Sequence, residues 1–506
     1  MIYFFGLLVG CEIGGVDYAQ GERAKLFRRL GVNQRYIYSE LPGSRELKLY
    51  ENLGINRKEM LCVEASIAGH QSLECKVVLD DILPLLEGRL GYDTIETPFL
   101  NIVVLKRGGV RVATIELTLD GKYVLKISYY CDNSLITTEW YLGTHYCTDI
   151  FSYDEVNNPI LSRRIFMSPN GNKVYEKIYS SSEKKYVFQD GKKYRKEELY
   201  EIFFEINSIG EKDFIIIDRP SFMDYCQAIL QKAKAKKIVV FHSGHFFEKY
   251  ESTAALNVNF EYYGYYKNAN AVDCFVVSTD EQRDDFVEKL EKYGVGEAKV
   301  ETIPVYSISC TKRDNEVRKR RSIVTASRLA LGKRIDWLIR AVVEAHKKNE
   351  DITLDIFGEG AEYDALSNLI YELNANDYIS LKGHQNIDDL LCEYELYASA
   401  STSETFGITL LQAVQSGNAV IGLDTRYGNH IFIKEEENGH LIDVDLELVG
   451  DEKYFDFLIQ RYANAILDIF SSEEKLEQYR NKSYAIAEEY LDSKIEEKWI
   501  SLMESI

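Results

Sequence analysis

Short apolar runs alternate with segments of helical spacing over most of this 506-residue chain, and this alternation constrains the fold more than any other feature. The first run, residues 2–9, is continuously apolar, as in a parallel strand that is covered on both faces. The glycine pair Gly14-Gly15 follows, and residues 16–30 then carry apolar side chains at helical spacing. Repeated units of this kind predict parallel sheets with helices on both faces.

A different pattern occupies residues 76–197. Alternating β-branched and aromatic residues are separated there by turn signals such as "RGG", "LDG" and "PNGN", which is typical of an antiparallel meander. We therefore predict an α/β chain with two doubly wound Rossmann-like domains facing an interdomain cleft and a β-meander inserted in the first. The predicted boundaries are 1–75 with 198–308 for the first domain, 76–197 for the insert, 309–486 for the second domain and 487–506 for a C-terminal helix that packs back on the first.

Composition limits the classes of function. The formal net charge of −21 argues against a general nucleic-acid binder, whose affinity depends on neutralising phosphates. The nine cysteines show no C-x-x-C spacing, so they indicate neither a zinc site nor a disulfide framework and favour reduced thiols in a cytoplasmic protein. The apolar opening segment is too short to span a membrane and lacks the basic region of a signal peptide. The basic loop 309–322 is expected to be solvated, with peripheral contact at the inner face of the membrane as a minor alternative.

Candidate phosphate-binding residues lie where strands are expected to end, which is where open parallel sheets bind ligands. Gly14 and Gly15 open a helix, and a helix N-terminus favours an anion; a structural tight turn is an equally good interpretation. Arg328 follows a predicted strand, and Lys333 lies at the start of the next helix. Two cations at that edge suit a diphosphate, although such a pair is often only a solvated surface feature.

Two further segments carry candidate sugar-binding residues. The segment "HSGH" places His242 and His245 after a predicted strand. Without further ligands they do not indicate a metal site, so we expect His242 to hydrogen-bond a sugar hydroxyl and His245 to be structural. The segment "SETFGITLLQ" places Glu404 at the end of another strand, Gly407 at a helix start and Gln412 within that helix. Positions 404 and 412 are expected to face one cleft at different heights.

In combination, these motifs resemble the nucleotide-binding half of the retaining two-Rossmann-domain glycosyltransferases. The matching segments lie within residues 322–442 and include "TASRLALGKRID", "IFGEG", "SLKGH" and "STSETFGITLLQAV". With "GGVDYAQGERAKLFRRL", "VVFHSGH" and "ETIPVYSI", nearly the whole chain is similar to the catalytic-subunit family of the O-linked N-acetylglucosamine transferases that act on serine-rich-repeat adhesins. The resemblance is looser in the insert.

The resemblance implies a UDP-sugar in the interdomain cleft and a role for each matching position. Arg328 and Lys333 would neutralise the diphosphate, while His242 and Glu404 would lie by the reacting sugar, and these four are the predicted catalytic residues. The implied substrate-binding positions are Gly15 and Val16 at the diphosphate, Gly358 in "IFGEG", His384 by the base, Phe406 and Gly407 by the sugar, Ile408, Thr409 and Leu410 by the phosphate, and Gln412 at the ribose.

Two positions depart from the family pattern. Thr405 stands where glycine is usual, and Gln412 stands where glutamate is usual. A glutamine still accepts one ribose hydrogen bond and donates another, so we expect weaker nucleotide binding, retained chemistry and modest tightening on Gln412→Glu. The implied mechanism needs no metal and no cofactor, because the protein's main contribution is to stabilise the departing diphosphate.

The resemblance also implies the reaction and a partner. The reaction is retaining transfer of N-acetylglucosamine or glucose from a UDP-sugar to serine and threonine hydroxyls of a serine-rich-repeat adhesin. The partner is a homologous, non-catalytic subunit that docks on the insert, although ordinary cross-strand packing also explains the insert's aromatic residues. Two alternatives stay open: a teichoic-acid α-glycosyltransferase, against which the acidic balance argues mildly, and an adhesin-binding pseudoenzyme, against which the presence of Arg328, Lys333 and Glu404 argues.

Overall fold

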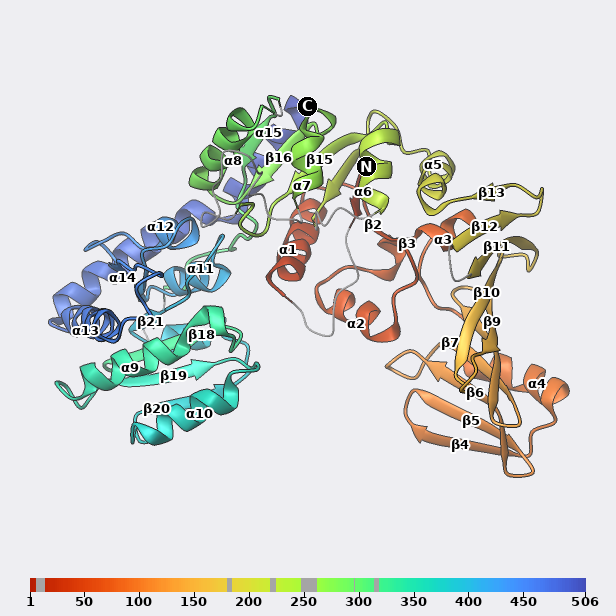
Figure 1. Ribbon diagram of the computed structural model, residues 1–506, viewed down its shortest axis with the longest axis horizontal. Coiled ribbons are helices and arrows are strands. Elements are labelled where there is room, and N and C mark those ends of the chain that lie inside the picture. Colours follow the sequence, from red (N-terminus) through yellow and green to blue (C-terminus); the bar gives the residue numbers. More distant parts are fainter. Residues whose placement is uncertain (6–13, 180–183, 219–223, 247–261, 295, 314–317) are drawn as a thin grey trace.

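The structure is a computed structural model that describes residues 1–5, 14–179, 184–218, 224–246, 262–294, 296–313 and 318–506. Three sheets organise this described chain. Figure 1 shows them as an arch, with one parallel sheet at the top, an antiparallel sheet on the right and a second parallel sheet on the left. The predicted fold class, two Rossmann-like domains with an inserted meander, is therefore confirmed.

The first parallel sheet has seven strands in the order β17-β16-β15-β14-β1-β2-β3. The inner strand β1 is buried along its whole described length, because helices cover both faces of the sheet. The rest of the predicted run 2–9 lies outside the described residues. The elements are β1 (Ile2–Phe5), α1 (Gly15–Arg29), β2 (Gln34–Tyr38), α2 (Ser44–Asn52), η1 (Arg57–Glu59), β3 (Met60–Cys62), α3 (Val63–Ile67), α5 (Lys196–Ile206), β14 (Phe214–Ile217), α6 (Asp224–Lys232), β15 (Lys236–Val240), α7 (Tyr263–Lys267), η3 (Ala269–Ala271), β16 (Cys274–Val277), α8 (Asp280–Lys292) and β17 (Val300–Thr302).

Ten antiparallel strands form the second sheet, and each strand pairs with its neighbours along the chain. The sheet lies in sequence between β3 and β14, which both belong to the first parallel sheet, so it is an insert. Its elements are α4 (Leu79–Leu90), β4 (Thr94–Phe99), β5 (Ile102–Arg107), β6 (Val110–Leu117), β7 (Val124–Cys131), β8 (Ser134–Tyr141), β9 (His145–Tyr153), β10 (Pro159–Met167), β11 (Lys173–Tyr179), β12 (Lys184–Phe188) and β13 (Lys193–Tyr194).

The insert is built on two hydrophobic cores. Helix α4 packs on strands β5 to β7 through Ile82 and Leu86, and this core belongs to the insert alone. The inner strands contribute Tyr146, Phe166 and Tyr175 to the same core as the first parallel sheet. The inner half of the insert is therefore continuous with the first domain.

The third sheet has six parallel strands in the order β20-β19-β18-β21-β22-β23. Helices α9 and α13 share a core on one face, and α11 packs in a separate core on the other. The elements are β18 (Ser322–Ala326), η4 (Leu331–Lys333), α9 (Ile335–His346), β19 (Thr353–Phe357), α10 (Tyr363–Glu372), β20 (Ile379–Gly383), η5 (Leu390–Glu393), β21 (Leu396–Ala398), α11 (Ile408–Gln415), β22 (Ala419–Leu423), α12 (Gly428–Phe432), β23 (Gly439–Ile442), α13 (Glu452–Ile469), α14 (Glu473–Ala487), η6 (Glu488–Tyr490) and α15 (Asp492–Ser505).

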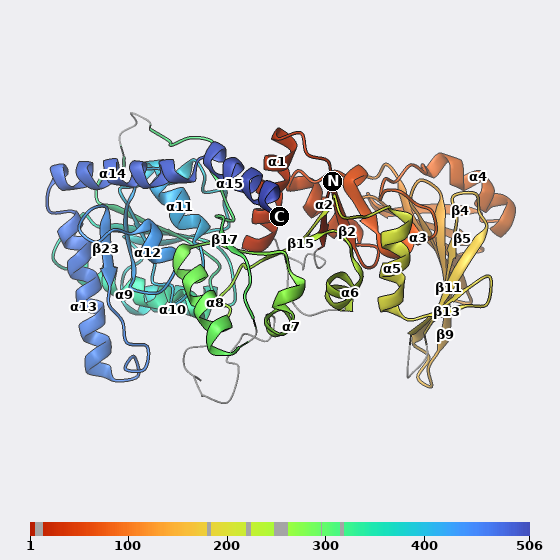
Figure 2. The ribbon, with the colours of Figure 1, turned by 90° about the horizontal axis from the view of Figure 1, so that it is seen from above.

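The chain crosses between the two parallel-sheet domains twice, and the crossings lie side by side. The Ile308 N–H donates to the Tyr490 carbonyl (3.0 Å), and the Ile308 carbonyl accepts from the N–H of Asp492 (2.8 Å). After the second crossing, α15 returns to α1 (Figure 2), where the rings of Trp499 and Phe27 meet edge-on with centroids 5.4 Å apart. The C-terminal helix thus ties the second crossing to the first domain.

Candidate functional site

The N-termini of α1 and α11 face each other across the two parallel-sheet domains. Gly14 is the N-cap of α1, and its N–H donates to the Asp17 carboxylate at 2.8 Å. A Cβ atom on Gly15 would lie 3.9 Å from Cδ1 of Ile408, the first residue of α11. Two positive helix ends therefore meet at one place, which favours an anion. Val16, the next predicted position, is half-buried there.

The start of α11 depends on a glycine. Gly407 has φ +84°, and a Cβ atom at this position would lie 2.7 Å from the Leu410 side chain. Ile408, Thr409 and Leu410 form the first turn, in which backbone N–H groups lack intrahelical acceptors. The Thr409 hydroxyl accepts from the Tyr397 hydroxyl at 3.0 Å. Leu410 is buried, so only its backbone N–H is suited to a ligand.

The two predicted cations differ in their surroundings. The Lys333 ammonium donates to the Glu404 carboxylate and to the Ser401 hydroxyl, the second at 3.3 Å. The Arg328 side chain is exposed at the carboxyl end of β18, and it has no ion-pair partner within the part of the chain that the structure describes. Arg328 is therefore available to an incoming anion, whereas Lys333 is already held by a carboxylate.

The aromatic ring of Phe406 belongs to the protein core. Phe406 is 3% exposed, and its ring centroid lies 5.2 Å from that of Phe432 and 5.9 Å from that of Tyr490. The Phe406 side chain is therefore not available to a sugar, and only the main chain of Phe406 could make the sugar contact predicted for this position.

Gln412 has a partner that the sequence did not indicate. Its Nε2 donates to Oδ1 of Asp388 at 2.6 Å. Asp388 lies on the loop after β20, and Lys312 bonds to its carbonyl. The only sequence signal for this residue is the acidic pair Asp388-Asp389 in a polar loop, which does not indicate which helix it faces. A negative charge thus lies next to position 412, although residue 412 itself is neutral.

Gly358 brings two loops of the second parallel sheet into contact. Its φ is +135°, and a Cβ atom there would lie 1.9 Å from the Ser327 carbonyl oxygen, directly before Arg328. Its N–H donates to the Gly383 carbonyl at 2.8 Å, and the neighbouring His384 is exposed. Glycine is therefore required at 358 because two backbones approach closely there, beside the loops that carry Arg328 and His384.

His242 belongs to a buried charged group. Its Nε2 lies 2.9 Å from Oδ1 of Asp218, and the same oxygen accepts from Arg23. Burial alone would raise the pKa of Asp218, but Arg23 and His242 hold it well below its usual range. Because a carboxylate only accepts, it fixes His242 with a proton on Nε2. Sequence analysis missed Asp218, which directly follows the apolar run "FIII".

His245 is a structural residue, as its sequence context favours. It is fully buried among Phe241, Tyr266 and Phe286, and neither ring nitrogen has a hydrogen-bond partner among the described residues. Burial, with Arg426 nearby, lowers its pKa to about 3. His245 is therefore neutral at ordinary pH.

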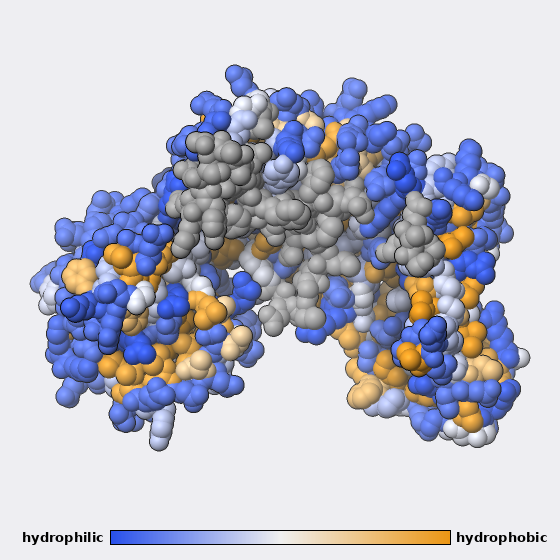
Figure 3. Space-filling view, in the orientation of Figure 1, coloured by the Kyte–Doolittle hydropathy of each residue, from blue (hydrophilic) through white to orange (hydrophobic). Residues whose placement is uncertain are grey.

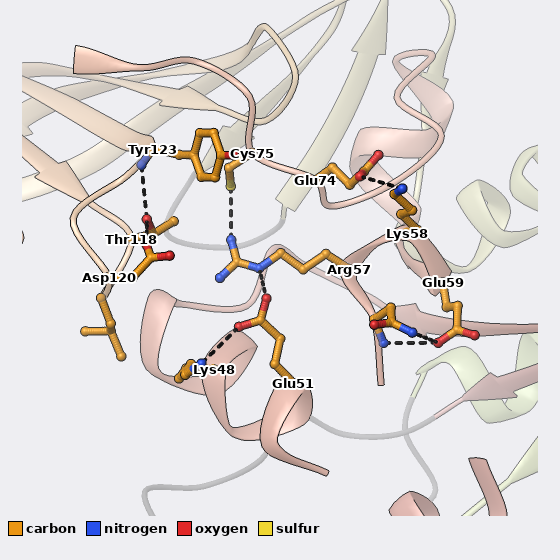
Figure 4. A pocket seen from close by; sticks show the side chains of 12 residues that line it. Lys48, Glu51, Arg57, Lys58, Glu59, Glu74, Cys75, Thr118, Asp120 and Tyr123 are labelled. Atoms are coloured by element: carbon orange, nitrogen blue, oxygen red, sulfur yellow. Dashed lines mark hydrogen bonds and ion pairs between the residues drawn. The ribbon is translucent and has the colours of Figure 1, made fainter. Parts of the chain in front are cut away.

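A polar cavity of about 620 Å³ lies at a different place, between the first parallel-sheet domain and the insert (Figure 4). Arg57 in this cavity pairs with Glu51 (2.7 Å) and with the Cys75 sulfur (3.3 Å). None of the predicted site residues lines it. Within the described ranges, no group of three or more His, Cys, Asp or Glu side chains is placed to hold a metal ion.

Comparison with known proteins identifies the family. A family model described as "Glycosyl transferases group 1" matches residues 311–485. A Streptococcus pneumoniae serotype 4 protein, the GtfA subunit of a UDP-N-acetylglucosamine–peptide N-acetylglucosaminyltransferase, is 33% identical and covers 100% of this chain and 99% of its own length. The chain belongs to this GtfA-subunit family. It is therefore a glycosyltransferase, and the expected enzyme class is confirmed.

Solved structures agree over the whole chain. The pneumococcal O-GlcNAc transferase GtfA in complex with UDP and GlcNAc is 32% identical, with a TM-score of 0.85 over 100% of this chain and 98% of that chain. A chain of a solved GtfA/B complex is 32% identical, with a TM-score of 0.90 over 100% of this chain and 99% of that chain. None of the described helices combines the length and the apolar character needed to cross a membrane.

Proposed function

We propose that this protein transfers N-acetylglucosamine from UDP-N-acetylglucosamine to serine and threonine hydroxyls of a serine-rich-repeat adhesin. The full-length relatives have this donor and a peptide acceptor in their names, and one solved relative holds UDP and GlcNAc. One observation carries the proposal: the N-termini of α1 and α11 meet at one place. Lys333 bonds there to Glu404, just before Gly407, the N-cap of α11. Both helix ends and both cations suit a sugar diphosphate.

The residues at this site would act mainly on the leaving group. Negative charge grows on the diphosphate as its bond to the sugar breaks, and preorganised cations and backbone N–H groups stabilise that charge. Arg328 offers a forked donor and Lys333 a point charge, while the first turn of α11 offers N–H groups. Because these groups neutralise the diphosphate, no metal is required, and we expect EDTA to leave the rate unchanged.

His242 and Glu404 would orient the sugar. The Asp218 carboxylate fixes the proton on Nε2 of His242 and thereby the orientation of the ring beside the proposed sugar position. Glu404 holds Lys333 and would accept from sugar hydroxyls of a bound donor. We therefore expect Glu404→Gln to reduce turnover more than UDP affinity.

Transfer assays test the proposal directly. The protein is incubated, with and without a partner subunit, with a serine-rich peptide and either UDP-N-acetylglucosamine or UDP-glucose. We expect N-acetylglucosamine transfer, reduced about a hundredfold or more by Arg328→Ala or Lys333→Ala because each removes one stabiliser of the leaving diphosphate. The matched control is Lys348→Ala, which removes an exposed cation of the same domain whose ammonium bonds to Asn464 on the protein surface.

Each other outcome identifies a different function. Transfer to polyribitol phosphate but not to the peptide would establish the teichoic-acid alternative. Binding of UDP-sugar and peptide without transfer would establish the pseudoenzyme. Near-normal turnover in both cation variants would place the diphosphate elsewhere.

The insert is the proposed docking surface for a homologous, non-catalytic subunit, since a solved relative forms a GtfA/B complex. All six residues of the edge strand β4 are exposed, and Phe99 and Leu100 at its end are 70% and 77% exposed. Figure 3 shows apolar areas over the insert. An exposed strand edge with large apolar residues is suited to protein–protein contact.

We further propose that the protein acts in the cytoplasm. None of the eight described cysteines forms a disulfide, and six of them are buried. Thiols remain reduced in that compartment. Fractionation of the native host, with the thiol state measured by alkylation, tests the location.

A further inference from the structure

Helix α8 of the first parallel-sheet domain holds the loop before α12 in the second. The Glu281 carboxylate accepts from the Tyr427 N–H (2.9 Å), from Arg426 Nε (3.1 Å) and from His430 Nδ1 (3.0 Å). The Asp285 carboxylate accepts from the Tyr427 hydroxyl (2.8 Å) and also pairs with Arg426. Two acids of one domain thus accept hydrogen bonds from three residues of the other, Arg426, Tyr427 and His430.

Tyr427 has a strained backbone at this contact. Its φ is +73° with ψ −104°, a conformation that is unfavourable for a bulky residue. Such a conformation persists only when the surroundings impose it. The bonds that its N–H and hydroxyl donate to Glu281 and Asp285 are among the surrounding contacts, and both acids belong to the other domain.

The loop that carries Tyr427 lies directly against the loop that carries Glu404. The backbones of Glu404 and Tyr427 pair as an isolated parallel bridge, and the Gly428 N–H donates to the Glu404 carbonyl at 2.8 Å. A Cβ atom on Gly428 would lie 2.4 Å from the Phe406 carbonyl oxygen. Because no space separates the two loops, a displacement of Tyr427 must displace Glu404, which in turn holds Lys333.

The same end of α8 also contacts the loop of His242. Nε2 of Gln282 donates to the Ser243 carbonyl at 3.1 Å. The Arg426 guanidinium lies 5.7 Å from the centre of the Phe246 ring, which follows this loop. The start of α8 therefore contacts the loop of His242 directly and reaches the loop of Glu404 through the Tyr427 loop.

We propose that Tyr427 and Arg426 are positioning residues for the transfer reaction, held by Glu281 and Asp285 only when the two parallel-sheet domains are docked. Docking then imposes the strained loop conformation and sets Glu404 and Lys333 relative to His242. In the undocked state the loop relaxes, and the sugar pocket is misaligned. This inference rests on the proposed function, since it assigns the alignment of that same site.

The test is Glu281→Ala in the full-length protein, with Glu288→Ala as its control. Glu288 lies on the same helix, is 66% exposed and, among the described residues, pairs only with neighbouring Lys289. We expect Glu281→Ala to lower the kcat of peptide glycosylation roughly ten- to hundredfold, the effect of misplacing a reacting group by about 1 Å. UDP affinity by calorimetry should fall far less than kcat, because Arg328 and the first turn of α11, which supply most of the proposed diphosphate contacts, lie on the other domain.

A second variant tests the strain. Glycine adopts positive φ without cost. In a Tyr427→Gly protein, the additional substitution Glu281→Ala should therefore lower kcat less than it does in the wild-type protein. Tyr427→Phe, which loses only the bond to Asp285, should be non-additive with Asp285→Asn because both remove the same interaction.

Three results would overturn the inference. One is a Glu281→Ala protein with a lower melting temperature and normal kcat, which is the result of a purely structural contact. Another is a fall of UDP affinity in proportion to kcat. The third is full additivity of Tyr427→Gly and Glu281→Ala. If the wild-type protein transfers no sugar to the peptide, the proposed function fails separately, and hydrolysis of the UDP-sugar serves as the rate for the same comparison.

Discussion

Gln412 is not free to act alone, because its amide already donates to Asp388 at 2.6 Å. From the sequence, Gln412→Glu is expected to tighten nucleotide binding by restoring a charged acceptor. The neighbouring carboxylate reverses that expectation. A glutamate at 412 would face Asp388 across the same short distance, and two carboxylates this close cannot both ionise without cost.

We therefore expect Gln412→Glu to weaken UDP binding several-fold at pH 8. The like charge raises the carboxyl pKa of the pair, so one group is protonated as the pH falls, and the loss should become smaller towards pH 5. Calorimetry with UDP at both pH values measures this. The double variant Gln412→Glu with Asp388→Asn should recover the lost affinity, and tighter binding by Gln412→Glu alone would show that Asp388 moves away when the nucleotide binds.

His245 makes the stability of the protein sensitive to acid. Its pKa is lowered to about 3 in the folded state by burial and by nearby Arg426 and Lys289, against about 6.5 in the unfolded chain. The unfolded state therefore binds an extra proton below about pH 6.5, so the free energy of unfolding falls as the pH drops through this window towards 3. His245→Phe should remove this part of the pH dependence. Denaturant unfolding at pH 7 and pH 5 measures the difference, and an unchanged slope with pH would contradict it.

At the scale of the element, the α11 N-terminus depends on Gly407. A Cβ atom there would lie 2.7 Å from the Leu410 side chain, and φ is +84°, so Gly407→Ala must shift the first turn. We expect UDP affinity to fall about tenfold, because the N–H groups of this turn would no longer point towards the diphosphate. Gly88→Ala in α4 is the control, since a Cβ atom at Gly88 meets nothing within 4 Å. Unchanged calorimetric affinity in Gly407→Ala would exclude this helix end from the diphosphate site.

The junction between the insert and the first domain is a buried ion pair. Lys177 of β11 is fully buried and donates to Glu64 of α3 (2.7 Å) and to Glu40 (3.0 Å). The Tyr186 hydroxyl also donates to Glu64, at 3.0 Å. Breaking one partner of such a pair leaves an uncompensated buried charge. This junction therefore ties β11 of the insert to α3 of the first domain.

At the scale of the whole molecule, the insert is not a detachable module. Its inner strands share a hydrophobic core with the first parallel sheet through residues such as Tyr146, Phe166 and Tyr175. From the sequence alone, deleting residues 76–197 is expected to separate partner docking from donor hydrolysis. The shared core makes that deletion unsuitable, because it would expose large aromatic side chains of the first domain.

Surface substitutions separate the two activities instead. We expect Phe99→Asp with Leu100→Asp, at the exposed end of β4, to weaken partner binding at least tenfold, since a central apolar contact is replaced by charge. UDP affinity should be unchanged, because the insert carries none of the predicted donor residues. Val156→Asp, at another exposed apolar position of the insert, is the control for charge alone. Normal complex formation by the double variant, measured by size-exclusion chromatography, would move the docking surface away from this edge.

The sequence by itself determined the elements of this protein. Apolar side chains at periods of two and 3.6 residues indicate strands and helices locally, so the two parallel sheets and the inserted meander could be predicted. The ends of strands gave most candidate residues, because a parallel sheet brings its carboxyl edges together. Lys333 and Glu404 do meet there.

Only the tertiary structure decided which polar groups share a contact. Asp388 and Gln412 are separated by 24 residues, Asp218 and His242 by 24, and Glu281 and Tyr427 by 146. No local pattern encodes these pairs, because they depend on how whole elements and domains pack. Periodicity records which face of an element is buried, whereas the partner that a polar side chain finds is set by the geometry of the packed chain.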